Sequence, residues 1–429
     1  MKKFIHLLGL AILSLSMTIF FTSCDPEEIW GENPNSGQTP GGGDIPGGGD
    51  GTTPTQFSGN IDVNTVWPDL GLDVDYVVSG KLYVKGNALL TIEPGVTIMF
   101  DGTDGGLEVI DNAGIHAVGT PEKPIVFTGP TNNPNNGSWD EFKVTTTRND
   151  NRIEYIQFIR GGSRDYWTEN AVVVLTGRVH MNNCLIDGGL ACGLYAEGKF
   201  YSFSNNTIKN VPNYPVWINS HDALYSMGAD NTYINNGKNM LHVNASNFNQ
   251  QDNTTLKRMS IPYYFKSGYN IYGAFKYTIE PGTTMLFGSN QKFNMEQQVT
   301  FIADGTIDAP ITIRGLEDEP GYWSGMWYRS NKAQSVMNYV NISGGGYEDG
   351  WTTNYNLFLS YDSRLTITNC IISGSQYYGI SLDHPSVMER ITHSNVVFLN
   401  NQGGNVYFHS GGEYNGVTYE VGQVIPQLP

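Results

Sequence analysis

The sequence predicts an all-β protein that folds as a right-handed, single-stranded parallel β-helix with an internal duplication. Short runs rich in Val, Ile, Phe, Tyr and Thr alternate with Gly, Asn and Asp, which is typical of strands joined by turns. Whole motifs recur at an offset of about 186 residues, as expected when a repeat unit is duplicated. Inside each copy, strand cores recur every 22–30 residues, which matches one coil of a β-helix.

The long repeat keeps an almost constant offset over more than a hundred positions. The string TIEPG at 91–95 returns at 278–282, an offset of 187 residues. Further matched segments have offsets of 184 to 186 residues: GTPEKPI at 119–125 with GTIDAPI at 305–311, GSW at 137–139 with GYW at 321–323, and NCLIDG at 183–188 with NCIISG at 369–374. We therefore predict two copies, 58–245 and 246–429, that form one continuous solenoid.

The short repeat predicts which residues stack from coil to coil. Each coil pairs only with its neighbours, so like residues lie about 4.8 Å apart along the axis. Amide side chains before the strand cores are expected to form ladders between coils: Asn183, Asn206, Asn369 and Asn395. A β-propeller is the competing fold, but it would need longer blades of several antiparallel strands.

The TIEPG string is predicted to be a corner of the coil. Pro suits the second position of a turn, and Gly suits the third position of a type II turn, where φ is positive. Glu93 and Glu280 precede these corners. They lie nearly eight coils apart, so they are too distant to act on one substrate atom. We therefore interpret both strings as structural.

The N-terminus predicts export from the cytoplasm. Lys2 and Lys3 precede a largely apolar stretch at 4–21, which is too short for a membrane span and has no basic flank after it. The following Phe-Thr-Ser-Cys resembles a bacterial lipobox, with Phe where Leu is usual. Cys24 is therefore the expected lipidation site after removal of residues 1–23. An ordinary secretory cleavage site beside an unrelated Cys is the alternative.

The Gly/Pro-rich segment 24–57 is predicted to be a lipidated Cys and a flexible tether, because it cannot bury a core. Asp25, Glu27 and Glu28 resemble a surface-export signal of some Gram-negative lineages. This favours a lipid-anchored protein of the outer membrane that faces the cell exterior.

Charge limits the partners of the mature chain. Without residues 1–23 it holds 22 basic and 41 acidic residues, a net charge of −19. Such a surface repels phosphate backbones, so no nucleic-acid partner is expected. Neutral or cationic ligands are favoured, and an anionic polysaccharide would need Ca²⁺ as a bridge. The three cysteines beyond Cys24 are expected to be free and buried: Cys184, Cys192 and Cys370.

The two copies resemble a known family. LTIEPGVTIMF at 90–100 and the segment GLEVIDNAGIHAVGTPEKPIVFTG at 106–129 are similar to the opening coils of right-handed parallel β-helix repeat lipoproteins. The second copy repeats this text at 277–287 and 299–315 with modest drift. The resemblance covers most of the mature chain and implies a cell-surface lipoprotein that contacts glycans. It leaves activity open, because such β-helices include polysaccharide lyases, hydrolases and adhesins.

Two equivalent loops are the predicted binding sites, since loops on a rigid scaffold carry aromatic and acidic side chains outward. The first loop, GGSRDYWTEN, supplies Arg164, Asp165, Tyr166, Trp167 and Glu169. The second loop, GGGYEDGWTTN, supplies Tyr347, Glu348, Asp349 and Trp351. An aromatic ring stacks on the apolar face of a sugar while carboxylates bind its hydroxyls. Neighbouring tryptophans are expected to extend this surface: Trp139, Trp323 and Trp327. A purely structural role for the loop tryptophans is the alternative.

Catalytic and metal sites are weaker predictions. The string at 216–222, VWINSHD, superficially resembles the WIDH of pectate lyases, but Asn219 replaces the Ca²⁺-binding Asp and Ser220 is inserted. Asp101 and Asp104 form a candidate Ca²⁺ loop that the second copy lacks. No other cofactor is expected.

The predicted function is non-catalytic glycan or cell-surface binding; the alternatives are a polysaccharide lyase or glycoside hydrolase, and a structural surface component.

Overall fold

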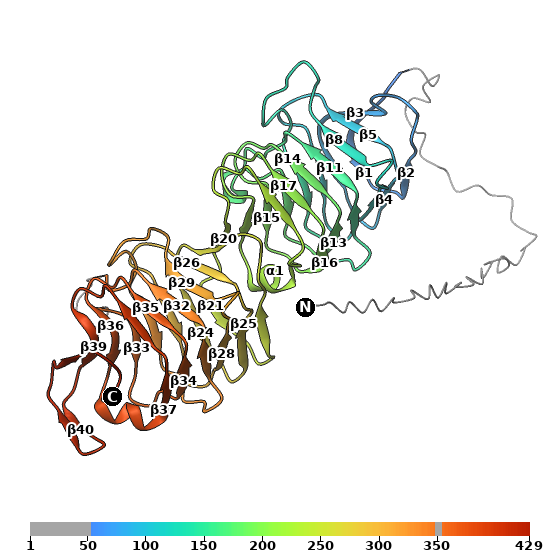
Figure 1. The fold of residues 1–429 in the computed structure, drawn as a ribbon. Coiled ribbons are helices and arrows are strands. Elements are labelled where there is room, and N and C mark those ends of the chain that lie inside the picture. Colours follow the sequence, from blue (N-terminus) through green and yellow to red (C-terminus); the bar gives the residue numbers. More distant parts are fainter. Residues whose placement is uncertain (1–52, 348–353) are drawn as a thin grey trace, which may run out of the picture. The chain divides into compact units, whose positions relative to one another are not determined.

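The computed structural model describes residues 53–347 and 354–429, which form a parallel β-solenoid (Figure 1). The predicted fold class is confirmed. The first strand begins at Thr55, two residues before the predicted end of the tether at residue 57. Cys24 and the predicted signal peptide lie outside the described residues. No helix in the described part of the chain is long and apolar enough to cross a membrane.

Three ladders of parallel strands build the first copy. Ladder I contains β1 (Thr55–Ile61), β3 (Tyr76–Val84), β5 (Thr97–Phe100), β8 (Ile125–Thr128), β11 (Ile156–Ile159), β14 (Leu185–Asp187), β17 (Thr207–Lys209) and β19 (Thr232–Ile234). Ladder II starts at the second part of β1, which pairs with the second part of β3, and continues through β6 (Gly106–Val109), β9 (Phe142–Val144), β12 (Val173–Leu175), β15 (Leu194–Ala196), β18 (Val216–Ile218) and β20 (Leu241–Val243). Ladder III contains β2 (Thr65–Trp67), β4 (Leu89–Ile92), β7 (Gly114–Val118), β10 (Arg152–Glu154), β13 (Val179–Asn182) and β16 (Phe200–Ser204).

The second copy extends ladder II and adds two new ladders. Ladder II continues through β23 (Tyr263–Phe265), β26 (Thr284–Phe287), β29 (Ile311–Gly315), β32 (Val340–Ser343), β35 (Ile371–Ser373) and β38 (Val397–Leu399). Ladder IV contains β21 (Asn247–Asn249), β24 (Tyr269–Tyr272), β27 (Lys292–Met295), β30 (Gly325–Tyr328), β33 (Tyr355–Leu359), β36 (Tyr378–Leu382), β39 (Gly404–Phe408) and the antiparallel β42 (Val424–Ile425). Ladder V contains β22 (Thr254–Leu256), β25 (Lys276–Ile279), β28 (Thr300–Asp304), β31 (Val336–Asn338), β34 (Leu365–Thr368) and β37 (Ile391–Ser394).

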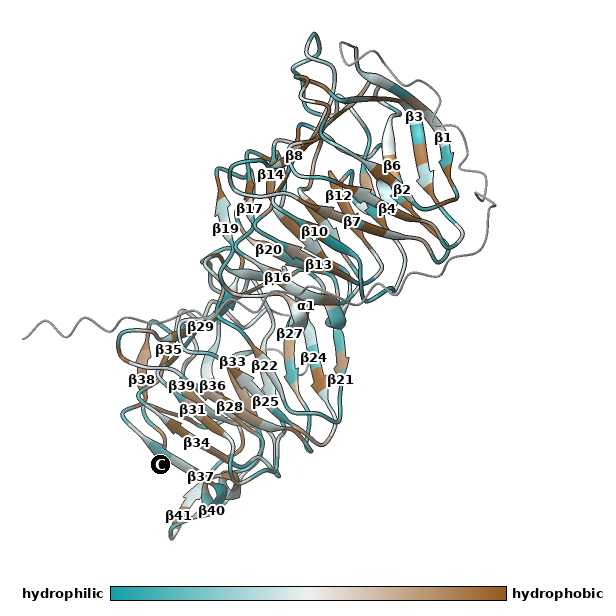
Figure 2. Cartoon of the chain, turned by 90° about the vertical axis from the view of Figure 1, so that its right-hand side faces the viewer, coloured by the Kyte–Doolittle hydropathy of each residue, from teal (hydrophilic) through white to brown (hydrophobic). Residues whose placement is uncertain are grey.

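Few elements lie outside these ladders. The remaining ones are the hairpin of β40 (Gly412–Tyr414) and β41 (Val417–Tyr419), the helix α1 (His221–Ser226), and the 3₁₀ turns η1 (Tyr166–Thr168) and η2 (Pro385–Arg390). Apolar stretches follow the strands and hydrophilic stretches follow the connecting loops (Figure 2). Side chains alternate between the interior and the surface along many strands, as in β5, where Ile98 and Phe100 are buried, whereas every residue of β12, β15, β20 and β23 is buried.

The second copy is displaced by one ladder relative to the first. The equivalent strands β5 and β26 both follow a TIEPG corner, yet β5 belongs to ladder I and β26 belongs to ladder II. The displacement arises because β20 ends the first copy on ladder II and pairs directly with β23. Equivalent strands of the two copies therefore do not stack on each other. The loop after β11 joins ladder I to ladder II, whereas the equivalent loop after β32 joins ladder II to ladder IV.

Both TIEPG strings form the predicted corners. In the first, the N–H of Val96 donates to the carbonyl of Glu93 over 3.4 Å, and Gly95 has a φ of 96°. In the second, the N–H of Thr283 donates to the Glu280 carbonyl over 3.2 Å. The Glu280 carboxylate also accepts a backbone N–H from the adjacent coil. The positive φ explains why Gly is needed at this corner.

The predicted amide ladders form at several coils. Asn206 donates its amide to Asn231 over 3.0 Å, and Asn395 donates to Asn369 over 2.9 Å. Asn183 has a φ of 56°, which places it in the left-handed region. Asn tolerates that conformation better than most residues. Asn369 and Asn395 share it, with φ values of 52° and 49°.

The cysteines are free and buried, as predicted. Cys184 donates its thiol to the Asn182 carbonyl over 3.3 Å, and Cys370 repeats the contact with Thr368 over 3.2 Å. Burial raises the pKa of Cys184 to about 12 and that of Cys370 to about 11. These thiols therefore remain protonated and unreactive at neutral pH.

Candidate functional site

The loop between β11 and β12 presents two aromatic side chains to solvent. Tyr166 is 77% exposed and Trp167 is 83% exposed. Their rings meet edge to face, with centroids 6.5 Å apart. We call these two residues the aromatic tip. Large aromatic side chains this exposed are uncommon on a soluble surface, and they favour a contact with a ligand or partner.

Hydrogen bonds inside η1 fix the aromatic tip. The Asp165 carboxylate accepts the N–H of Trp167 over 2.9 Å, and the buried Thr168 hydroxyl donates to the Asp165 carbonyl over 3.1 Å. Glu169 ends the turn with a φ of 56°, and its N–H donates to Tyr166. The carboxylate of Asp165, predicted as a ligand for sugar hydroxyls, thus already serves as the cap of the turn.

Glu169 is partly buried beside this turn. Burial raises the pKa of its carboxyl group, and the charge of Lys266 partly offsets that rise. Its side chain therefore faces a less polar environment than the open loop suggests. Among the predicted residues of the first loop, the structure brings Tyr166 and Trp167 together at the surface and turns Asp165 inward.

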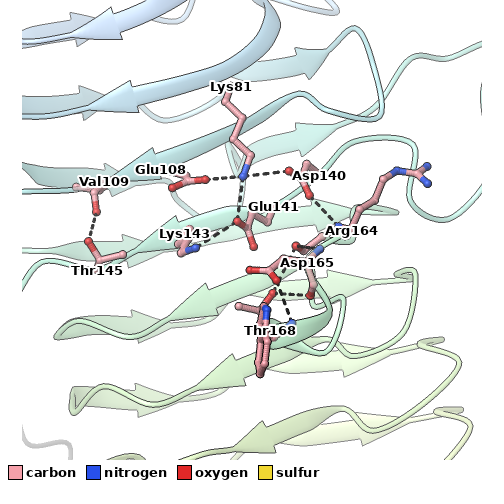
Figure 3. A network of polar contacts seen from close by, with 12 residues as sticks. Lys81, Glu108, Val109, Asp140, Glu141, Lys143, Thr145, Arg164, Asp165 and Thr168 are labelled. Carbon is pink, nitrogen blue, oxygen red and sulfur yellow. Dashed lines mark hydrogen bonds and ion pairs between the residues drawn. The ribbon is translucent and has the colours of Figure 1, made fainter.

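A charged network centred on Lys81 lies beside the start of the loop between β11 and β12 (Figure 3). Lys81 Nζ contacts Glu108, and lies 3.1 Å from both Asp140 Oδ2 and Glu141 Oε1. The second oxygen of Asp140, Oδ1, accepts the N–H of Arg164 over 3.1 Å. Asp140 therefore links the charged network to Arg164, which directly precedes the Asp165 cap of the turn.

Burial controls the ionisation of this network. The Glu141 side chain is only 1% exposed, and this burial raises its pKa, although Lys81 and Lys143 act against the rise. Burial alone would lower the pKa of Lys81, but the contacts with Glu108, Glu141 and Asp140 raise it overall. Glu141 Oε2 is buried and has no hydrogen-bond partner. The network is therefore tightly paired, apart from this one oxygen.

Sequence reasoning missed this network. Its members come from three separate segments, and they become neighbours only through the strand register, in which Lys81 pairs with Gly106 and Glu108 pairs with Lys143. The sequence did contain a signal for this network: positive and negative residues alternate at outward positions from β3 to β6 to β9. It could be recognised only with the offsets between coils, which vary from 21 to 36 residues in this copy.

Removing the Asp140 carboxylate should release the turn. We expect Asp140→Ala to speed amide hydrogen exchange at 164–170 by about tenfold or more, because a hydrogen bond to a charged acceptor is lost. Exchange mass spectrometry of the intact chain measures this. Ser324→Ala is the matched control, since Ser324 stands at the equivalent position of the second copy. Unchanged exchange at 164–170 in Asp140→Ala would show that the turn is held by its own bonds alone.

The second predicted loop is described only at its start. Tyr347 is partly buried, and its N–H donates to the Trp323 carbonyl over 3.0 Å. Glu348, Asp349 and Trp351 lie outside the described residues. The loop follows β32, so it leaves the solenoid at a different corner from the aromatic tip.

The expectation that Trp139 and Trp323 extend the binding surface is wrong, because both are fully buried. Trp139 Nε1 donates to the Ile159 carbonyl over 2.8 Å, and Trp323 Nε1 donates to Ser343 over 2.7 Å. Each indole also stacks on a phenylalanine with ring centroids 5.0 Å apart. The same core contact is thus preserved in both copies. Trp327 is partly exposed, on the outer face of ladder IV.

The weaker site predictions have plain structural explanations. Ser220 caps α1, because its hydroxyl accepts the N–H of Ala223 over 3.0 Å, so the VWINSHD string is a strand followed by a short helix. Asp101 accepts a hydrogen bond from Ser79. Within the described ranges, no three His, Cys, Asp or Glu side chains are grouped so as to hold a metal ion.

One family matches part of the chain. The model of the pectate-lyase-like beta helix domain matches residues 63–157. This range includes Lys81, Glu108, Asp140 and Glu141, and it ends before the aromatic tip. The comparison with curated proteins finds no match. The family match agrees with the parallel β-solenoid, and this fold is compatible with carbohydrate-related roles.

Proposed function

We propose that this protein is a cell-surface lipoprotein that binds glycans without cleaving them, through the aromatic tip of Tyr166 and Trp167. The observation that carries the proposal is the exposure of both rings on a hydrogen-bonded turn. A preformed contact loses little conformational entropy on binding. The ring of Trp167 offers a face for the apolar side of a sugar, and the neighbouring Glu169 offers an acceptor for hydroxyls.

The proposed location rests on the N-terminal sequence. Lipidation of Cys24 would anchor the chain in the outer membrane, and residues 25–52 would hold the solenoid away from the lipid surface. The acidic residues after Cys24 favour display on the cell exterior. The strongly negative mature chain favours neutral glycans over anionic ones unless Ca²⁺ bridges the charges.

Trp167→Ala should abolish or strongly weaken glycan binding while leaving the fold intact, because the side chain is exposed and packs on little besides Tyr166. A glycan array probed with the full chain, followed by calorimetry on any ligand found, measures this. Tyr201→Ala is the control, since Tyr201 is an exposed aromatic residue of another ladder. Binding that survives Trp167→Ala would exclude the aromatic tip as the site.

The charged network supports one enzymatic alternative. Carboxylates clustered with a lysine on adjacent coils are what a polysaccharide lyase or glycoside hydrolase would need. Here each of the three carboxylates contacts Lys81, and Glu141 is buried, so non-catalytic binding is favoured. Release of reducing ends or unsaturated products from polysaccharides would contradict the proposal. A purely structural surface component would show neither binding nor product release.

A further inference from the structure

The outer face of ladder IV carries aromatic side chains on successive coils. We call Trp327, Phe358, Tyr378, Tyr407 and His409 the aromatic strip. All five side chains are partly exposed. Ring centroids lie 5.9 Å apart for Trp327 and Phe358, 5.5 Å for Phe358 and His409, and 4.1 Å for Tyr378 and Tyr407. The strip is therefore a continuous aromatic surface.

The strand register sets the length of the strip. Trp327 pairs with Phe358, Phe358 pairs with Ser381, and Ser381 pairs with Tyr407. Three steps between neighbouring strands span about 14 Å. Ser381 lies between the coils that carry Phe358 and His409. Because its side chain is small, the rings of Phe358 and His409 contact each other over it. A ligand that follows the strip must therefore be extended along the solenoid axis.

Polar atoms without partners lie along the same strip. Trp327 Nε1, Arg329 Nε and Ser381 Oγ are buried and have no hydrogen-bond partner, and Ser381 is 0% exposed. Buried polar atoms are nearly always paired in native proteins, because an unpaired one costs about 1–3 kcal/mol. Two donors and one hydroxyl left unpaired beside stacked rings indicate a ligand that has both apolar faces and hydroxyl groups.

Charges near the strip are already balanced. Arg329 lies over the Trp327 ring at 4.5 Å and forms an ion pair with Glu296. At the other end, burial lowers the pKa of His409, and Asp383 acts against that change. An acidic sugar would thus meet carboxylates as well as Arg329 and Lys292, whose Nζ lies 5.8 Å from the centre of the Trp327 ring. This arrangement favours an uncharged ligand.

We infer that the aromatic strip is a second binding site, which takes a neutral polysaccharide chain lying along the solenoid. At the matching positions of the first copy, Lys143 and Val174 replace Trp327 and Phe358, whereas Tyr195 and Trp217 stand where the second copy has Ser381 and Tyr407. This site is separate from the aromatic tip. The two therefore make independent predictions about binding.

Affinity electrophoresis of the full chain tests the inference. Native gels would contain hydroxyethyl cellulose, xyloglucan or galactomannan as neutral probes, and polygalacturonate as the acidic probe. We expect at least one neutral polymer to retard the wild-type chain. Tyr407→Ala and Trp327→Ala should each weaken that retardation by about tenfold or more, as loss of a stacked ring would. Tyr407→Phe keeps the ring and should retain binding, which separates loss of contact from misfolding.

One control tests whether loss of any exposed ring gives the same result. Tyr201→Ala should leave retardation by the strip ligand unchanged, because Tyr201 lies in β16 of ladder III. No retardation by any neutral polymer, retardation by polygalacturonate alone, or retardation lost only in Trp167→Ala would each overturn the inference. A wild-type dimer that Tyr407→Ala converts to a monomer would also overturn it, because a second copy of the chain would then cover the strip.

Discussion

Trp323→Ala is expected to lower the free energy of unfolding by about 3–5 kcal/mol, because a fully buried indole leaves a cavity. The change also removes the Nε1 bond to the Ser343 carbonyl and the stacking on Phe287. Trp139→Ala should cost a similar amount, since its surroundings in the first copy are the same. Urea unfolding followed by circular dichroism measures both losses.

Trp167→Ala provides the matched comparison for these core substitutions. The Trp167 side chain is 83% exposed, so its removal should change the unfolding free energy by no more than about 0.5 kcal/mol. A solenoid need not unfold in one step, so the fluorescence and circular dichroism transitions should be compared. A loss below about 1 kcal/mol in Trp323→Ala would contradict the buried position of this indole.

Lys81→Met is expected to cause a pH-dependent loss of stability of about 2–3 kcal/mol at neutral pH. The substitution leaves Glu141 buried with only Lys143 nearby, at 3.6 Å, and removes the common partner of Glu108 and Asp140. Burial already raises the pKa of Glu141 in the folded state. A buried carboxyl group with a raised pKa favours folding when protonated, and this contribution is lost as pH rises through the folded-state value.

The pH profile therefore distinguishes this mechanism from a simple loss of packing. Removing Lys81 raises the folded-state pKa of Glu141 further, so the deficit of Lys81→Met should be small near pH 4 and grow toward pH 7. Melting temperatures across this range measure it. Lys85→Met is a suitable control, because Lys85 lies one residue beyond β3 and belongs to the same segment. A deficit that stays constant with pH would point to lost packing of the lysine stem.

The sequence was sufficient for the fold but not for the candidate sites. Repeated Pro-Gly corners and strand cores that recur every 22–30 residues indicate a parallel solenoid, because each coil pairs only with its neighbours. The exposed Tyr166 and Trp167 could be predicted, since the loop lengthens the local repeat. The burial of Trp139 and Trp323 could not be predicted, because an indole beside a glycine-rich turn can point either into the core of the coil or out to solvent.

The charged network and the aromatic strip depend on register. Lys81 and Glu141 are 60 residues apart in sequence, and Trp327 and Tyr407 are 80 apart. Lys81 and Glu141 come into contact, and Trp327 and Tyr407 fall in one row, only when every intervening coil has its correct length. Because the loops between coils vary in length, the sequence does not show which residues of neighbouring coils pair. An error of one residue in the assumed register moves a side chain from the surface to the core.

The one-ladder displacement between the copies determines where equivalent features of the two halves are presented. A duplication that kept its register would have stacked equivalent residues along a single side of the solenoid. Here the loop after β11 and the start of the loop after β32 leave at different corners. The two proposed sites, the aromatic tip between ladders I and II and the aromatic strip on ladder IV, would therefore take separate ligands, and such an arrangement would favour bridging between polymer chains, where avidity comes from cross-linking.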